Sequence, residues 1–462
     1  MLVAMTDVPS QIEAVSQTDA PDREAAAAPS PPQTDVILGS GSARGIGRRG
    51  LLRWGGLATA GMVAAGAPPA AAAAGRAVPS AADAAPSSGP AGASRDRIPP
   101  DTLPGGVYDR YVAQLAARGQ FSGVVLLSHG GRTVLSRSYG MADEEKGVRN
   151  GENVAFNLSS AGKPFHAVAV LQLAQQGRLR LTDAIGHHLT GFPVDVAEQV
   201  TIHHLLSGTS GTALPEEDVQ RVFQSRDEVH AYHEQRARQV KLVGVPGLPD
   251  TAHAEAEVTL CALIVEAVAG TTYWDYVQEN VFTRCGMIRS GFFTRPRWLT
   301  DVHLAHPYMA VAGGGVVDAV RHLDLGSSRP EVLGKNPGRA FIDAPGDGGF
   351  ATAPDLVRFG HALLDGTLLD PPWAGVLTAA KQPHGPASFG AYQVVASIAG
   401  RQWVHERSGG NPGIGATWSI YPDTGWVGVI LTNRDGAPLQ DLVGRQTQAV
   451  TGAAPESGGS GG

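Results

Sequence analysis

The sequence contains very little cysteine and no dense run of basic residues. Its two cysteines, Cys261 and Cys285, stand in apolar, helix-like segments, so we expect buried free thiols rather than a disulfide bond. The formal net charge of −7, with no basic run, argues against a nucleic acid as partner. The length of 462 residues and the hydrophobic content of 42% are enough for one large or two ordinary domains.

Long hydrophobic runs are also missing, including near the N-terminus. Arg48-Arg49 precede a mildly apolar, Gly/Ala-rich run that ends near Ala67 and is too short to span a bilayer. This arrangement resembles a twin-arginine export signal, so we expect a secreted protein, with a cytoplasmic one as the alternative. The expected organisation is a disordered N-terminal region over residues 1–74, a Pro/Ala/Ser linker over 75–105, a folded domain over 106–452 and a flexible tail over 453–462.

A complete dinucleotide-binding signature is missing as well. Gly41-Ser-Ala-Arg-Gly-Ile-Gly47 resembles the glycine loop of short-chain dehydrogenases, which must lie between a strand and a helix. An Ala/Gly/Pro tract follows it instead, and the chain has no Tyr-x-x-x-Lys pair, which that chemistry needs. We therefore expect no cofactor.

Lysine is scarce, and one of the five lysines follows a serine by three residues, in Ser160-Ala-Gly-Lys163. A run of good helix formers comes next, Gly177 closes it, and Pro164 fits only in a first turn. The pattern predicts a buried helix with Ser160 at its start and Lys163 one turn on, on the same face. The positive helix end favours an alkoxide at Ser160, and a buried lysine can accept its proton. Taken alone, the short pattern fits equally well a helix cap followed by a lysine that reaches solvent.

The expected elements run in the order strands, helices, strands and a closing helix. Val124–Ser128 and Thr133–Ser138 are typical of a hairpin, and four more strands are expected between Tyr392 and Thr432. Pairing the hairpin with the last strands gives one antiparallel sheet from residues 106–158 and 390–450. The fold class expected is therefore α/β (α+β), with a sheet flanked by helices and a mainly helical subdomain.

Seven segments of the chain resemble, in order, blocks of the serine β-lactamase-like family, on its class C, esterase and penicillin-binding-protein side. They are Phe121–Leu127, Tyr139–Asp143, Phe156–Lys163, His204–Gly211, Gly348–Asp355, Ser408–Gly413 and Leu431–Arg434. The resemblance covers roughly residues 106–450. It implies a β-lactamase/transpeptidase-like fold, an active site between the sheet and the helical domain, and acyl transfer through a serine ester.

One catalytic position departs from the family pattern before the expected helix Val258–Gly270. The family has Tyr-x-Asn there, and this chain has His253-Ala-Glu255. A neutral imidazole can move protons near pH 7 as the family's tyrosine does, and Glu255 could orient it. The alternatives are a drifted position in an inactive protein and a solvated loop carboxylate.

A second departure is in the family's third motif, Lys-Thr-Gly or His-x-Gly, where this chain has Arg407-Ser408-Gly409. Arg407 offers a planar, permanent charge that suits a substrate carboxylate, or else it makes a structural ion pair. By resemblance, the oxyanion hole uses the backbone N–H groups of Ser160 and Gly410. Glycine at 409 and 410 is expected to let the strand approach the substrate closely.

No metal site is expected. His253-Ala-Glu255 mimics the His-x-Glu of zinc deaminases, but the Pro-Cys-x-x-Cys partner is absent. The pairs His187-His188 and His203-His204 lack ligand-like companions in the sequence, so we expect ordinary surface or core histidines.

The sequence therefore predicts a serine acyl-enzyme hydrolase or transacylase that acts on a small-molecule ester or amide. The altered tyrosine position and third motif argue against efficient β-lactam hydrolysis. The alternative is a catalytically degenerate binding protein on the same scaffold. We expect a monomer without a membrane span. The candidate catalytic residues are Ser160, Lys163 and His253, and the candidate substrate-binding residues are Glu255, Arg407, Ser408 and Gly409.

Overall fold

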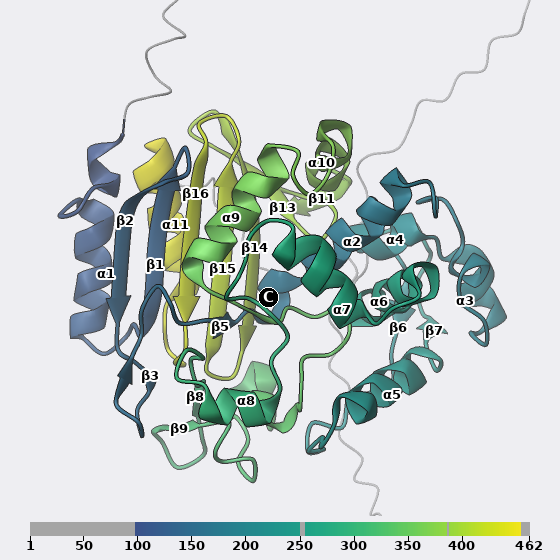
Figure 1. Ribbon diagram of the computed structural model, residues 1–462, viewed down its shortest axis with the longest axis horizontal. Coiled ribbons are helices and arrows are strands. Elements are labelled where there is room, and N and C mark those ends of the chain that lie inside the picture. The colour runs from purple at the N-terminus through teal and green to yellow at the C-terminus, as the bar shows by residue number, and fades with distance from the viewer. Residues whose placement is uncertain (1–97, 250–254, 386–387, 454–462) are drawn as a thin grey trace, which may run out of the picture. The chain divides into compact units, whose positions relative to one another are not determined.

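An eight-stranded antiparallel sheet is the framework of the computed structural model, which describes residues 98–249, 255–385 and 388–453 (Figure 1). The strand order is β11-β12-β13-β14-β15-β16-β1-β2, so the first hairpin pairs with the last strands, as predicted. In this order the strands are β11 (Gln382–Gly385), β12 (Ser388–Gly390), β13 (Val395–Ala399), β14 (Gln402–Asn411), β15 (Ile414–Tyr421), β16 (Trp426–Thr432), β1 (Gly123–His129) and β2 (Arg132–Tyr139). The expected export signal, with Arg48-Arg49, lies outside the described residues.

The sheet is wider than the sequence predicts at one edge. β11 and the first two residues of β12 lie before residue 390, where the predicted sheet segment begins. β11 contains Pro383 and ends at Gly385, residues that give no strand signal but are tolerated at a sheet edge. The folded region also begins earlier than predicted, because a short 3-10 helix, η1 (Pro100–Thr102), buries Thr102.

Helices cover both faces of the sheet. On one face α1 (Val107–Ala117) and α11 (Leu439–Thr451) pack over one set of alternating side chains, such as Val125 of β1. On the other face α2 (Pro164–Gln175) and α9 (Ala353–Leu364) share a core with the opposite set, such as Leu126. Every residue of β1 before His129 is buried, because this strand lies inside the sheet with helices on both sides.

The remaining helices include a mainly helical subdomain, gathered on the opposite side of the picture from α1 (Figure 1). Both cysteines are buried free thiols, as predicted. The helices are α3 (Val194–Gln199), α4 (Ile202–Ser207), α5 (Arg226–Ala237), α6 (Glu255–Ala269), α7 (Tyr273–Val277), the π-helix η4 (Gln278–Thr283), α8 (Arg295–Thr300), α10 (Pro371–Thr378) and the 3-10 helices η2 (Ser159–Gly162), η3 (Ile185–His187), η5 (Pro330–Val332) and η6 (Pro337–Arg339).

Four two-stranded ladders connect these parts. They are β3 (Met141–Asp143) with β4 (Val148–Arg149), β5 (Phe156–Asn157) with β10 (Phe350–Ala351), β6 (Thr212–Ala213) with β7 (Lys241–Leu242), and β8 (Tyr308–Ala310) with β9 (Val316–Asp318). Within the described part of the chain, no single helix has both the length and the apolar character of a membrane span. Ala256–Ala269 and Tyr273–Thr283 meet both conditions only as a pair, across a bend of 79°.

Candidate active site

Ser160 lies in η2, the turn that leads into the buried helix α2. Every residue from Pro164 to Ala174 is buried, and the proline occupies the first helical position, where its missing N–H has no partner to lose. Lys163 joins η2 to α2, its amide donates to the Ser160 carbonyl at 3.2 Å, and only 6% of its surface is exposed. The predicted arrangement, with the serine at the helix start and a buried lysine one turn on, is present.

The residue before the candidate nucleophile is held in a strained conformation. Ser159 has φ of 46°, a left-handed value that is unfavourable for a residue with a side chain. Its amide donates to Asn157 Oδ1 at 2.9 Å, and its hydroxyl donates to the Gly410 carbonyl at 3.0 Å. These two hydrogen bonds fix the turn and connect it to β14, the strand that carries the predicted oxyanion glycine.

β14 and β15 pack against the back of this turn. A Cβ atom at Gly409 would lie 2.3 Å from the amide nitrogen of Ala161 and 2.5 Å from the carbonyl oxygen of Leu158. Trp418 Nε1 donates to the Ala161 carbonyl at 2.8 Å, and Arg407 Nε donates to the Ser160 carbonyl at 3.0 Å. Only glycine fits at 409, because the strand lies backbone to backbone against the turn that contains Ser160.

The substrate-binding roles of Arg407, Ser408 and Gly409 stay predictions, and the structure shows where the three residues lie. None of the three lines the cavity that contains Ser160. Side chains alternate along a strand, so Ser408 points to the other face of the sheet, where its hydroxyl shares a hydrogen bond with Thr417 at 2.9 Å. Arg407 lies under the turn, where burial lowers its pKa to about 10 against the opposing effect of Asp347 and Glu257.

A glycine-rich loop also packs against the turn. A Cβ atom at Gly162 would lie 2.2 Å from Gly348 Cα, and the Leu158 amide donates to the Gly349 carbonyl at 2.9 Å. β5 and β10 pair directly beside this contact, with Asn157 opposite Phe350. The loop therefore approaches the turn closely and brings Asp343 and Asp347 to the cavity that contains Ser160.

The cavity has a volume of about 310 Å³, at the small end of the range for ligand pockets. Ser160 and Lys163, which belong to one sequence motif, and Gly410, which lies about 250 residues later on β14, all line it. Ser160 itself is partly exposed. The structure thus brings a hydroxyl, an amine and a backbone glycine to one small pocket.

Asp343 lies in this pocket with an unusual charge environment. Burial and the nearby Asp347 raise its pKa to about 7, and the opposing hydrogen bond from Asn157 is too weak to restore the ordinary value. Asn157 Nδ2 donates to both carboxyl oxygens of Asp343, at 3.0 and 3.1 Å. Asn157 therefore connects the turn of Ser159 to a carboxyl group that is close to half-protonated near neutral pH.

His166 fixes the other end of the loop from inside α2. Burial lowers the pKa of His166 to about 3, so its ring is neutral at physiological pH. Its Nδ1–H donates to the Gly346 carbonyl at 2.9 Å. A Cβ atom at Gly346 would lie 2.3 Å from the carbonyl oxygen of Val258, so the loop also lies against the backbone of α6.

Comparison with known proteins identifies the family. A family model described as Beta-lactamase matches residues 108–452. The chain belongs to the beta-lactamase family. It is 25% identical over 259 residues to a putative penicillin-binding protein, PbpX, of Bacillus subtilis (strain 168), and 29% identical over 257 residues to penicillin-binding protein 4* of the same organism. Each match covers 54% of this chain and 56% or 53% of the relative, so the chain spans about half the length of these curated relatives.

Solved structures share the beta-lactamase-type fold. A penicillin-binding protein from Bacillus halodurans superposes with a TM-score of 0.61 at 23% identity, over 72% of this chain and 97% of that one. EstCE1, a hydrolase with promiscuous acyltransferase activity, superposes with a TM-score of 0.59 at 21% identity, over 74% and 97%. These matches confirm the predicted fold class.

Two predicted residues of this beta-lactamase family member fall at the edge of what the structure describes. Glu255 is the first residue of α6, and His253 lies outside the described residues. The segment His204–Gly211 contacts α6, because the Ser210 amide donates to Glu257 Oε1 at 3.3 Å.

Sequence analysis missed Asn157, Asp343 and Asp347. Asn157 carries a local signal, since an asparagine two residues before a backbone N–H can cap it. The sequence around Asp343 and Asp347 has no feature that predicts their place in the pocket, because nothing in their spacing links them to a serine far earlier in the chain.

The expectation that His187-His188 lack ligand-like companions is wrong. Asp183, His187 and His188 place ligand atoms within 4.8 Å of one another. Within this group Asp183 Oδ2 already contacts His188 Nε2 at 3.1 Å and accepts from the Arg180 amide at 2.8 Å. The sequence could not show this, because a turn folds Asp183 back toward the histidines.

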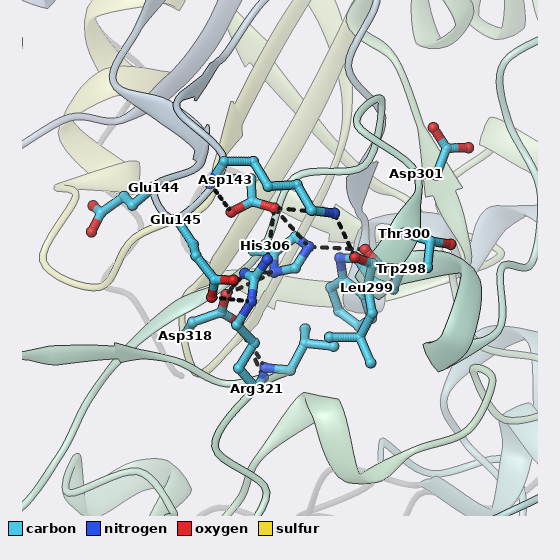
Figure 2. Close-up of polar contacts among 12 residues, drawn as sticks. Asp143, Glu144, Glu145, Trp298, Leu299, Thr300, Asp301, His306, Asp318 and Arg321 are labelled. Carbon is cyan, nitrogen blue, oxygen red and sulfur yellow. Dashed lines mark hydrogen bonds and ion pairs between the residues drawn. The ribbon is translucent and has the colours of Figure 1, made fainter.

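A second cluster of polar side chains lies away from the pocket, where β3 and β9 approach the segment after α8. Figure 2 shows the side chains of Asp143, His306, Asp318 and Arg321 converging there. Arg321 Nη2 pairs with Asp143 at 2.9 Å and its Nη1 pairs with Asp318, while His306 Nδ1 contacts Asp318 at 2.7 Å. Burial alone would raise the pKa values of Asp143 and Asp318, but hydrogen bonds from Arg321 and from their neighbours lower both.

Proposed function

We propose that this chain is a serine hydrolase or acyltransferase that forms an acyl-enzyme on Ser160, with Lys163 as the base. The observation that carries the proposal is that Ser160 and the buried Lys163 line one small cavity together with Gly410. The position of Ser160, just before a 12-residue helix, adds the positive end of a helix dipole to a developing alkoxide.

The proposed reaction has two halves. Ser160 Oγ attacks the carbonyl carbon of an ester or amide while its proton passes to Lys163, and the carbonyl oxygen becomes an oxyanion. The N–H groups of Ser160 and Gly410 would stabilise that oxyanion. The leaving group departs with a proton, and water or another acceptor then takes the acyl group from Ser160.

The strained turn and its supports would keep this geometry fixed. Arg407 and Trp418 donate to the carbonyls of Ser160 and Ala161, and Ser159 donates to Gly410. Such preorganisation matters because the donors must already point at the oxyanion when charge develops. We include His253 as a proposed second proton carrier, on the resemblance alone.

Covalent labelling tests the proposal. A fluorophosphonate probe should add to Ser160, as read by intact mass and peptide mapping, and Ser160→Ala should remove the adduct. Lys163→Ala should slow labelling by roughly 10²-fold, as loss of a general base does. His253→Ala tests the second proton carrier in the same assay and in turnover of a chromogenic ester.

No adduct on the wild-type chain, or an unchanged adduct in Ser160→Ala, would contradict the proposal. The first outcome would favour the alternative, a binding protein on the same scaffold.

A further inference from the structure

The cavity of the proposed acyl-enzyme contains a carboxyl group that the proposed chemistry does not use. Asp343 lines the cavity with Ser160, and its side chain is partly exposed there. It is coupled to the nucleophile's turn through Asn157, which bonds Asp343 with Nδ2 and the Ser159 amide with Oδ1. A group on a substrate that reaches Asp343 is therefore held in the same pocket as the reacting carbonyl.

The negative charge of Asp343 is poorly compensated by the protein. Among the described residues its carboxyl accepts hydrogen bonds only from Asn157 and makes no ion pair within 4.0 Å. Its raised pKa, about 7, follows from burial and from Asp347, and no positively charged residue acts to lower it. A buried anion in this state is stabilised by any cation that enters the pocket.

Three cationic side chains that line the cavity have ion-pair or hydrogen-bond partners within the protein. Lys335 pairs with Glu217 at 3.5 Å, and Arg221 pairs with Glu228 at 2.8 Å. Arg339 donates to backbone carbonyls, including that of Val219 at 2.7 Å. The printed contacts of these three cations are thus with groups other than Asp343, whose carboxyl has the Asn157 amide as its hydrogen-bond donor.

We propose that Asp343 is a specificity residue that binds a protonated amine of the substrate, so that the pocket takes amine-bearing acyl compounds such as aminoacyl esters or amides. This inference rests on the proposed function. The ammonium group would donate to the carboxyl oxygens of Asp343, and the nearby Asp347 would add to the negative potential. Asn157 would stay bonded to Asp343, so that binding leaves the turn of Ser160 in place.

Two boronic acids of the same shape, one with an amine and one without, test how much the amine contributes to binding. In 1-aminoethylboronic acid an ammonium group replaces one methyl group of isopropylboronic acid, and both compounds accept the electron pair of Ser160 Oγ at boron. Their dissociation constants are measured at pH 7.5 by how strongly each slows fluorophosphonate labelling of Ser160, with each enantiomer of the amine tested separately. For the wild-type chain we expect at least one enantiomer to bind about 10-fold tighter or more than the isostere, the scale of a hydrogen bond to a charged group.

Variants at position 343 test the residue. Asp343→Asn keeps an oxygen acceptor for Asn157 but removes the charge, so the affinity ratio should fall to about 1, and Asp343→Glu should restore part of it. If either variant disturbs the position of Ser160, both boronic acids should bind more weakly. The ratio of their dissociation constants can then still be compared with the wild-type ratio. Asp365→Asn, an exposed acid on the far end of α9, is the matched control and should keep the wild-type ratio.

A wild-type ratio of about 1 or lower for both enantiomers, with Ser160 still labelled, would overturn this inference and leave the proposed function intact. A high ratio that survives in Asp343→Asn would also overturn it. A wild-type chain that no fluorophosphonate labels would remove the nucleophile and overturn both.

Discussion

Two groups of carboxyl side chains among the described residues have their charges balanced in opposite ways. At the cluster of Figure 2, Arg321 lies between Asp143 and Asp318, and the pKa values of both carboxyls are lowered. In the pocket, Asp343 has an amide partner instead of a cation, and its pKa is raised.

The contrast separates a structural role from a binding role. Pairing with Arg321 compensates two carboxylates within the protein itself, and the three groups connect β3, β9 and the segment just after β9. Asp343 would gain most from a cationic partner, which none of the residues in the described part of the chain provides. Raised acid pKa values in clefts are a recognised mark of functional sites, whereas paired carboxylates are common in ordinary structural networks.

Removing the cation from the cluster of Figure 2 should cause the largest change in the free energy of unfolding. Arg321→Met leaves two buried carboxylates without their counter-charge, and we expect a loss of about 3–5 kcal/mol in the free energy of unfolding. In the wild type, the low folded-state pKa values of Asp143 and Asp318 stabilise the fold near neutral pH, and this contribution is lost as the pH falls through those values. The deficit of the variant should therefore be greatest near pH 7 and shrink below about pH 4 in urea unfolding.

The control for this measurement is Arg297→Met. Arg297 pairs with Asp301 at 3.3 Å on the surface, with 55% of the arginine side chain exposed. A surface pair of this kind contributes less than about 1 kcal/mol. Equal losses for the two variants would show that the cluster of Figure 2 is no more than a surface ion pair in energetic terms.

Removing the charge from the pocket should change the free energy of unfolding by a smaller amount, and it should stabilise the protein instead of destabilising it. The pKa of Asp343 rises from 3.8 to about 7 on folding, so the folded state holds a proton that the unfolded state has lost. Its contribution to stability therefore falls as the pH rises from about 4 to 7, and Asp343→Asn should remove this loss. From pH 5 to 8 we expect the variant to gain about 1–3 kcal/mol relative to the wild type in urea unfolding. A variant that is equally destabilised at both pH values would contradict the idea of an uncompensated charge.

The smallest expected effect comes from a third acid, on the opposite face of the sheet. Burial raises the pKa of Glu406 from 4.5 to about 7, against weak hydrogen bonds from Ser419 and Ser408 at 3.4 Å. Because this rise is slightly smaller than that of Asp343, Glu406→Gln should gain slightly less than Asp343→Asn relative to the wild type from pH 5 to 8, about 1–2 kcal/mol, measured by urea unfolding.

Glu406→Gln also serves as a control for the ligand preference that is proposed for Asp343. Glu406 does not line the cavity, so the variant should keep the wild-type preference for the amine-bearing boronic acid. A lost preference would mean that general electrostatics, rather than contact with Asp343, controls which ligand binds.

The sequence by itself determined the parts of the site that are local in the chain. The run after Lys163 is apolar on every side, so it forms a helix buried all round, and Pro164 and Gly177 mark its ends. The strands β1, β2, β15 and β16 follow from residue type and turn signals, since these segments are rich in aliphatic, β-branched and aromatic residues and are bounded by glycine-containing turns.

Only the tertiary structure decided what surrounds Ser160. The roles of Arg407, Ser408 and Gly409 depend on which face of β14 meets η2, and a shift of one residue would have exchanged those faces. Asp343 reaches the pocket because glycines at 162 and 348 let two backbones touch, a contact between segments far apart in the chain. Propensities and spacing act over a few residues, whereas burial and charge compensation depend on every segment that packs nearby, so the pocket's charge could be read only from the folded chain.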